Sequence, residues 1–143
     1  MSGAYLDASA ILPLLIEEPG SAAVDRFLAT AAQPLIVSEF AAAEVASALS
    51  RLGRTQALEG PQDAVRRLAD FDSWRASSTG DIDLSAADIR LASMFVRRFD
   101  LMLRAPDAIH AAVCQRADLL LVTMDPRLAR AAQELGVRAQ LLE

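Results

Sequence analysis

Lysine is absent from this chain, and all 14 of its basic residues are arginines. A Walker-type nucleotide site, a haloacid-dehalogenase phosphatase and a response-regulator receiver all use a lysine, so the sequence excludes these three kinds of phosphate site. Histidine and cysteine occur once each, as His110 and Cys114. This scarcity disfavours zinc, which prefers imidazole and thiolate ligands.

Disulfides and membrane segments are also not expected. Cys114 has no partner for an internal disulfide, and its apolar neighbours predict a buried structural thiol and a reducing compartment. The apolar runs are far shorter than the roughly 20 residues that cross a bilayer, and no basic segment precedes a signal-like apolar stretch. We therefore expect a cytoplasmic protein that has no membrane partner.

The size and composition favour one compact unit. A chain of 143 residues that is 53% hydrophobic can bury one core, and no linker or repeat divides it, so residues 1–143 are expected to form a single domain. The net charge of −5 argues against a nucleic-acid partner, which usually meets a basic patch. That objection weakens if four of the 19 acids bind cations, because the other 15 would nearly balance the arginines.

Short apolar segments alternate with longer amphipathic ones, a pattern typical of an α/β domain with a parallel sheet. We expect a three-layer α/β/α sandwich around a short, mainly parallel central sheet. Ser38 and Ser85 are predicted to cap helices through their hydroxyl groups, with Asp88 completing a capping box at the second of these helices. Strands are expected over residues 4–8, 35–37, 81–84, 119–123 and 137–142, a polar loop over 76–80, and helices from residue 9 and over 19–31, 39–52, 61–74, 86–99, 106–116 and 126–135.

Four acids occupy places where acids are rarely found unless they are paired or bound to a metal. Asp7 and Asp125 each follow an apolar strand. Glu44 lies in an alanine-rich helix, and Asp107 opens another helix. Ligands of parallel sheets bind at the carboxyl ends of the strands, so Asp7 and Asp125 are expected at a ligand-binding edge.

Three of the four acids also have a structural explanation. Asp7, Asp107 and Asp125 stand at or beside helix starts, where aspartate caps free amide groups. Glu44 has no such explanation, because no basic residue precedes Arg51 in its helix and its neighbours one turn away are small or apolar: Phe40, Ala41, Ser47 and Ala48. A buried unpaired carboxylate costs several kcal/mol or takes up a proton, so a functional role is favoured for Glu44.

Neighbouring carboxylates repel one another by about 4 kcal/mol for each close pair at an effective dielectric constant near 20. A bound cation reverses the sign of this interaction. Oxygen ligands alone suit Mg²⁺ or Mn²⁺, and such an ion can activate water and polarise a phosphoryl oxygen. The acids therefore indicate phosphodiester hydrolysis.

The segments that carry the acids resemble those of the PIN-domain family, and more closely those of the VapC ribonuclease toxins of bacterial toxin–antitoxin pairs. The resemblance covers essentially the whole chain and rests on residues 5–10, Glu44, residues 103–112 and residues 121–129. It implies an endoribonuclease of single-stranded RNA that depends on Mg²⁺ or Mn²⁺ and binds no organic cofactor. The implied metal ligands and catalytic residues are Asp7, Glu44, Asp107 and Asp125. Met124 departs from the family, in which a polar residue such as asparagine often stands at that place.

Four other polar residues lie close to the acids in the sequence. Ser9 and Thr123 stand two positions from the first and the fourth acid, where their hydroxyls could support the site or could simply cap a helix or end a strand. His110, one helical turn after the third acid, could act as a general base, but packing explains it better, since the family's acids do not include it. Arg104 could bind phosphate or be a surface residue.

The resemblance also implies partners. A cognate VapB-like antitoxin would occupy the active-site groove and place an arginine among the carboxylates. A homodimer is implied as well, with the apolar helices over residues 20–52 as a candidate surface, although Phe27, Leu28, Phe40 and Leu49 could equally be core. Two alternatives stay open: a non-catalytic PIN-like protein-binding module, and a PIN-superfamily nuclease outside toxin–antitoxin systems.

Overall fold

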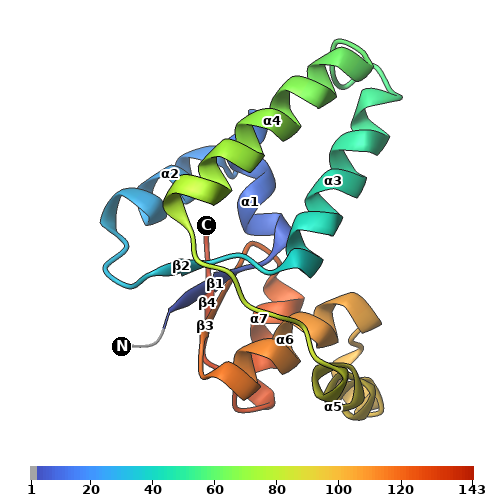
Figure 1. Cartoon of the computed structure of the whole chain (residues 1–143). Coiled ribbons are helices and arrows are strands. Elements are labelled where there is room, and N and C mark those ends of the chain that lie inside the picture. Colours follow the sequence, from blue (N-terminus) through green and yellow to red (C-terminus); the bar gives the residue numbers. More distant parts are fainter. Residues whose placement is uncertain (1–2) are drawn as a thin grey trace.

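Four short parallel strands form the centre of the structure, a computed structural model that describes residues 3–143. The strands are β1 (Ala4–Leu6), β2 (Leu35–Ile36), β3 (Leu120–Thr123) and β4 (Ala139–Leu141), in the spatial order β2-β1-β3-β4. Leu6 lies opposite Val122, and Thr123 lies opposite Leu141. The carboxyl ends of β1 and β3 therefore lie side by side (Figure 1).

Helices cover both faces of this sheet, which confirms the expected three-layer arrangement (Figure 1). One layer contains α1 (Ala8–Leu15), α2 (Ser21–Thr30), α3 (Glu39–Gly53) and α4 (Pro61–Ser78). The other contains α5 (Ala86–Val96), α6 (Ala105–Ala117) and α7 (Pro126–Glu134), with the 3₁₀ turn η1 (Phe99–Leu101) between α5 and α6. All strand pairs are parallel, because helices carry the chain from the end of one strand back to the start of the next.

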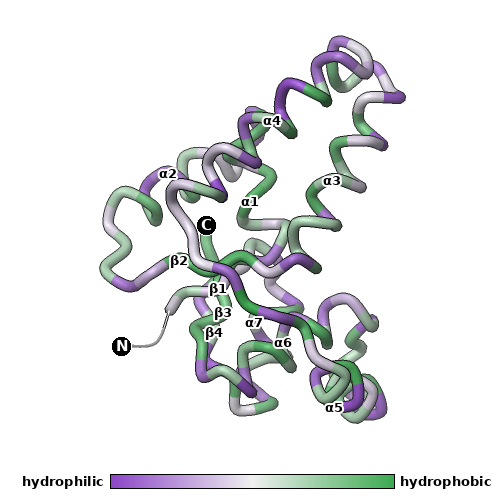
Figure 2. The backbone as a smooth tube through the Cα atoms, in the orientation of Figure 1, coloured by the Kyte–Doolittle hydropathy of each residue, from purple (hydrophilic) through white to green (hydrophobic). Residues whose placement is uncertain are grey.

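The side chains of the strands alternate between the two helical layers. Ala4 and Leu6 of β1 pack in a core with residues of α1, α2 and α3, whereas Tyr5 packs in a second core with residues of α6 and α7. Figure 2 shows the strands as mainly hydrophobic stretches. Burial on both faces explains why these strands are continuous apolar runs in the sequence.

The helix starts follow the capping groups that the sequence contains. The Ser38 hydroxyl accepts the Ala41 amide at 3.0 Å at the start of α3, and Ser85 and Asp88 form the predicted capping box of α5. Gly136, which follows α7, has a φ of 81°, a conformation that glycine adopts without strain. Cys114 is buried, as predicted.

The strand predicted over residues 81–84 is wrong. The chain before this segment pairs with β2 only through a single bridge between Ile36 and Gly80. Beyond it, the Asp81 carboxylate accepts the Ile82 amide at 3.0 Å and an Arg75 N–H at 3.0 Å. These side-chain bonds hold the segment in an irregular conformation beside a strand that is only two residues long.

Two predicted helix ends also differ from the structure. Helix α4 continues to Ser78, through most of the expected loop over 76–80, and the Ser77 hydroxyl finds an acceptor in the Ser73 carbonyl of the preceding turn. Helix α5 ends at Val96, three residues before the predicted end at Phe99. Within residues 3–143, no helix has the length and apolar character needed to span a bilayer.

Candidate functional site

The first and fourth acids lie where the strand order reverses. The chain passes from β1 to β2 on one side and then returns to β3 on the other side of β1, so β1 and β3 flank the switch point of the sheet. Asp7 directly follows β1, and its amide donates to the Val122 carbonyl of β3 at 3.2 Å. Asp125 follows the last residue of β3 by two positions. The fold thus brings both acids to the edge at which such sheets bind ligands.

Asp7 is 5% exposed, and both of its carboxylate oxygens accept hydrogen bonds. Oδ1 accepts from the Ser9 hydroxyl at 2.7 Å and from the Ala10 amide at 3.1 Å, while Oδ2 accepts from the Thr123 hydroxyl at 2.7 Å. Burial raises the pKa of Asp7, although His110 and these hydrogen bonds act in the opposite direction. Asp7 therefore caps α1 and is also held in a fixed orientation at the sheet edge.

The hydroxyls of Ser9 and Thr123 connect the ends of β1 and β3 around this carboxylate. Each hydroxyl has one proton and donates it to Asp7, so each is left to accept hydrogen bonds from other groups. Ser9 accepts the Met124 amide at 2.9 Å, and Thr123 accepts the Asp125 amide at 3.1 Å. Both hydroxyls thus contact the first acid directly while they fix the backbone that leads to the fourth.

Asp107 and Asp125 line one pocket of about 260 Å³, together with Arg104 and Arg127. Asp125 caps α7, because its Oδ1 accepts the Arg127 amide at 2.9 Å. Asp107 lies in the first turn of α6. Burial raises the pKa of Asp107, and the negative charges of Asp125 and Asp7 raise it further. Asp107 therefore interacts unfavourably with two of the other acids at this edge.

Glu44 lies against His110 instead. Its Oε1 is 2.5 Å from His110 Nε2, and the other ring nitrogen, Nδ1, is 2.6 Å from the Tyr5 hydroxyl. The His110 side chain is 2% exposed and interacts electrostatically with both Asp7 and Asp107. The packing role expected for His110 is thus incomplete, because both of its nitrogens are hydrogen-bonded.

The four acids do not yet form one compact ligand set. Within residues 3–143, no three histidine, cysteine, aspartate or glutamate side chains are close enough together to hold a single metal ion as they stand. Asp7 and Asp125 act on Asp107 at longer range, and Glu44 bonds to His110, which interacts with Asp7 and Asp107. A metal site shared by all four acids stays a prediction.

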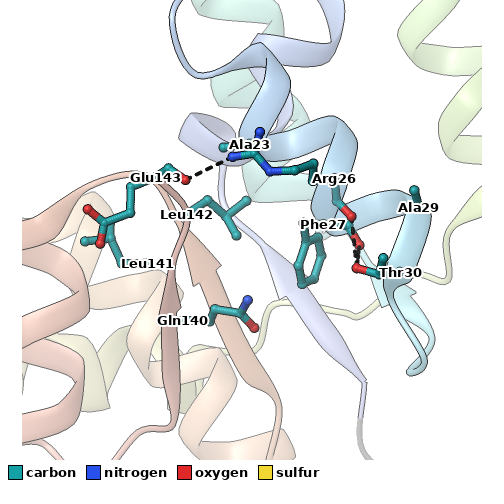
Figure 3. Close-up of a pocket in the computed structure, with 9 residues that line it drawn as sticks. All are labelled: Ala23, Arg26, Phe27, Ala29, Thr30, Gln140, Leu141, Leu142 and Glu143. Atoms are coloured by element: carbon teal, nitrogen blue, oxygen red, sulfur yellow. Dashed lines mark hydrogen bonds between the residues drawn. The ribbon is translucent and has the colours of Figure 1, made fainter.

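A larger pocket of about 510 Å³ lies elsewhere, between α2 and the end of the chain after β4 (Figure 3). Its wall includes Phe27, Arg26 and Leu142, and Arg26 donates to the Glu143 carbonyl at 3.3 Å. None of the four predicted acids lines this pocket. The size of a pocket therefore does not identify the candidate site in this protein, whereas the placement of the acids does.

Comparison with known proteins identifies the family. The family model of the PIN domain matches residues 4–134. This chain belongs to the PIN-domain family. Ribonuclease VapC46 of Mycobacterium tuberculosis is 36% identical to it in an alignment over 140 residues, which covers 96% of this chain and 95% of the relative. The predicted resemblance to VapC-type proteins is thereby confirmed.

Two solved structures share the fold. VapC20 of Mycobacterium tuberculosis, described as a sarcin–ricin loop cleaving toxin, matches with a TM-score of 0.72 and 18% identity over 90% of this chain and 95% of VapC20. A toxin–antitoxin complex from Klebsiella pneumoniae matches with a TM-score of 0.64 and 16% identity over 89% of this chain and 90% of the other. At these identities the likeness concerns the fold alone.

The sequence does not predict the roles of Tyr5 and Ser38 in holding His110. Tyr5 lies in the family-like segment over residues 5–10, and Ser38 is predicted only as a helix cap. The signal available was the tyrosine itself, because a tyrosine inside a buried strand brings a hydroxyl that requires a partner. Which partner it finds depends on tertiary contacts: Ser38 is 33 positions from Tyr5 in the sequence, and His110 is 105 positions from it.

Proposed function

We propose that this chain is a metal-dependent endoribonuclease and the toxin of a toxin–antitoxin pair, acting as one PIN-like domain. The observation that carries the proposal is the placement of three acids: Asp7 and Asp125 follow the neighbouring strands β1 and β3 at the switch point of the sheet, and Asp107 lines one pocket with Asp125. In the described part of the chain, the arginine ion pairs are made by other acids, such as Asp63 and Asp88. The 36% identity to a ribonuclease over nearly the whole chain supports the same assignment.

The chemistry of the donor set fits Mg²⁺ or Mn²⁺. Asp7, Glu44, Asp107 and Asp125 offer only carboxylate oxygens, which these ions prefer. A divalent cation would offset the repulsion by Asp125 and Asp7, which adds to the effect of burial on the pKa of Asp107. Glu44 uses Oε1 on His110, which leaves Oε2 for an ion. When bound, the ion would lower the pKa of the attacking water and stabilise charge on the phosphate.

The other residues of the site have supporting tasks in this proposal. Ser9 and Thr123 hold the Asp7 carboxylate in one orientation, so that it need not be ordered again when RNA binds. Arg104 and Arg127, which line the pocket with the acids, are placed to contact the phosphates that flank the scissile bond of a single strand. Hydrolysis would proceed by attack of a water held among the four carboxylates.

The proposed partners follow from the same family. A VapB-like antitoxin would inhibit the enzyme by occupying the active-site groove, and a structural neighbour was solved as a toxin–antitoxin complex. A homodimer is also proposed, but not through Phe27 or Leu49, because both are buried within this chain. The buried free thiol of Cys114 agrees with a cytoplasmic location.

The test is cleavage of mixed cellular RNA by the purified chain, free of antitoxin, in Mn²⁺ or Mg²⁺. We expect discrete fragments that disappear with EDTA and with Asp7→Asn, because the first removes the ion and the second removes one of its ligands. Fragments that persist in EDTA would contradict metal dependence. Absence of cleavage by folded protein that binds Mn²⁺ would favour a non-catalytic PIN-like binding module.

A further inference from the structure

A chain of buried hydrogen bonds runs from the start of α3 through β1 and α6 back to Glu44. The Ser38 hydroxyl lies 2.8 Å from the Tyr5 hydroxyl, which lies 2.6 Å from His110 Nδ1, and His110 Nε2 lies 2.5 Å from Glu44 Oε1. Ser38 and Tyr5 are fully buried and His110 is 2% exposed, whereas the Glu44 side chain is 31% exposed. This series of hydrogen bonds therefore reaches solvent only at the Glu44 carboxylate.

The donors and acceptors of this chain fit one direction. Ser38 Oγ accepts the Ala41 amide at 3.0 Å, and the Tyr5 hydroxyl is the acceptor that the structure offers for the Ser38 proton. Tyr5 then donates to Nδ1 of His110, and the remaining ring proton, on Nε2, is donated to the Glu44 carboxylate. In the opposite direction, the Ser38 proton would have no acceptor among the described residues, and a buried unsatisfied donor is costly.

Aromatic contacts limit movement of the imidazole further. The ring centroid of His110 lies 5.2 Å from that of Phe40 and 5.6 Å from that of Tyr5. Both separations lie in the range that aromatic pairs prefer. The ring is thus held by two hydrogen bonds and two aromatic neighbours, from β1 and α3.

We infer that His110, oriented by Tyr5 and Ser38, is a positioning residue that fixes the Glu44 carboxylate toward the acid-lined edge of the sheet. This inference rests on the proposed function. Asp7 is short and is held by Ser9 and Thr123, but a glutamate has an additional rotatable bond, and fixing it costs more side-chain entropy. His110 supplies the corresponding restraint.

The first test uses the fact that His110 is the only histidine of the chain. In untagged protein labelled with ¹⁵N-histidine, all imidazole nitrogen signals come from this residue. We expect Nε2 to carry a proton directed at Glu44, and we expect Tyr5→Phe to weaken this preference because it removes the hydroxyl that faces Nδ1. An Nε2 nitrogen without a proton in the native chain would overturn the inference.

The second test measures Mn²⁺ affinity and, on an RNA oligonucleotide, kcat and KM separately. We expect His110→Ala to lower Mn²⁺ affinity or kcat by roughly 10- to 100-fold with little change in KM, Tyr5→Phe to lower them less, and His110→Gln to recover part of the loss through its side-chain N–H. If His110→Ala does not fold, Tyr5→Phe answers the question, because it preserves the aromatic ring.

The matched control is Ser21→Ala, which removes another buried hydroxyl, one that donates to the Pro13 carbonyl and has no part in this chain of bonds. Folded Tyr5→Phe and His110→Ala proteins that behave like Ser21→Ala in Mn²⁺ affinity and kcat would refute the positioning role. If the native chain cleaves no RNA but shows the Nε2 proton and the loss of Mn²⁺ affinity, the positioning role holds and the proposed function fails.

Discussion

Asp88 and Asp107 occupy the same place in consecutive helices, since each is the third residue of α5 or α6. Asp88 completes a capping box with Ser85 and accepts an Arg116 N–H at 2.6 Å. Burial would raise the pKa of Asp88, but the hydrogen bonds from Arg116 and Ser85 outweigh it and lower the pKa. The pKa of Asp107 is raised, by burial and by the neighbouring Asp125.

The comparison shows that position within a helix does not decide whether an acid has a structural or a functional role. Asp88 is 1% exposed and has the guanidinium of Arg116 beside it, so its charge stabilises the fold. Asp107 is half-buried and lies near other acids at the switch point of the sheet, so its charge opposes folding, and in the proposed function a bound cation would offset this cost. An acid whose pKa is raised by other acids is therefore the better candidate for the active site.

The largest expected effect separates these two aspartates by activity. We expect Asp107→Asn to lower kcat for RNA cleavage by about 1000-fold, or about 4 kcal/mol of transition-state stabilisation, because it removes a proposed metal ligand. Asp88→Asn should retain kcat but lower the melting temperature. Initial rates and thermal unfolding of both proteins test this. Equal losses of activity in the two variants would remove the distinction.

The second effect concerns the cation. Mn²⁺ at a free concentration 100 times its dissociation constant should raise the free energy of unfolding by about 2.7 kcal/mol, if the unfolded chain does not bind it. Thermal or urea unfolding with and without Mn²⁺ measures the gain. We expect Asp88→Asn to preserve this gain and Asp107→Asn to reduce it. If Mn²⁺ does not change the melting temperature of the native chain, the proposed metal site among the acids is contradicted.

The third effect tests the structural aspartate alone. Arg116→Ala should lower the free energy of unfolding by about 2 kcal/mol, because it leaves the buried Asp88 carboxylate without its charged donor. This decrease is smaller than that expected when a fully buried ion pair loses one partner, because the Arg116 side chain is 39% exposed and water screens its charge. Urea unfolding measures the change, with Arg104→Ala as the control beside Asp107. A larger loss from Arg104→Ala would reverse the assignment.

The smallest effect is a difference in pH dependence, measured by urea unfolding in EDTA from about pH 7 down to about pH 3. Asp107 has a raised pKa, so its contribution to stability is largest below the ordinary value of 3.8 and is lost as the pH rises through the raised pKa. Asp88 has a lowered pKa, so its contribution is present above 3.8 and is lost as the pH falls through the lowered pKa.

The variants isolate the two contributions. The free energy of unfolding of the native chain minus that of Asp107→Asn should fall as the pH rises from 3.8. The free energy of unfolding of the native chain minus that of Asp88→Asn should fall as the pH drops below 3.8. Mn²⁺ should suppress the first difference and leave the second unchanged. If both differences in the free energy of unfolding change with pH in the same direction, the pKa values of Asp107 and Asp88 are shifted in the same direction and the proposed contrast fails.

Much of the fold could be predicted from local signals. The strands that follow from apolar runs, the capping serines Ser38 and Ser85, and the prolines that open α6 and α7 are all present in the structure. The segment over 81–84 was predicted wrongly because it has an alternating pattern but no long strand beside it. Periodicity indicates that a segment can form a strand, whereas pairing requires a partner of adequate length.

The sequence alone determined which residue types are available: four acids at the ends of strands or in helices, a single histidine, and no lysine to neutralise them. Only the tertiary structure decided which charges meet. Arg116 reaches Asp88 across 28 residues, His110 reaches Glu44 across 66, and Thr123 reaches Asp7 across 116. Local propensity acts over a few residues, but the energy of a charge depends on every group within several ångströms, and the chain crossovers decide which groups those are.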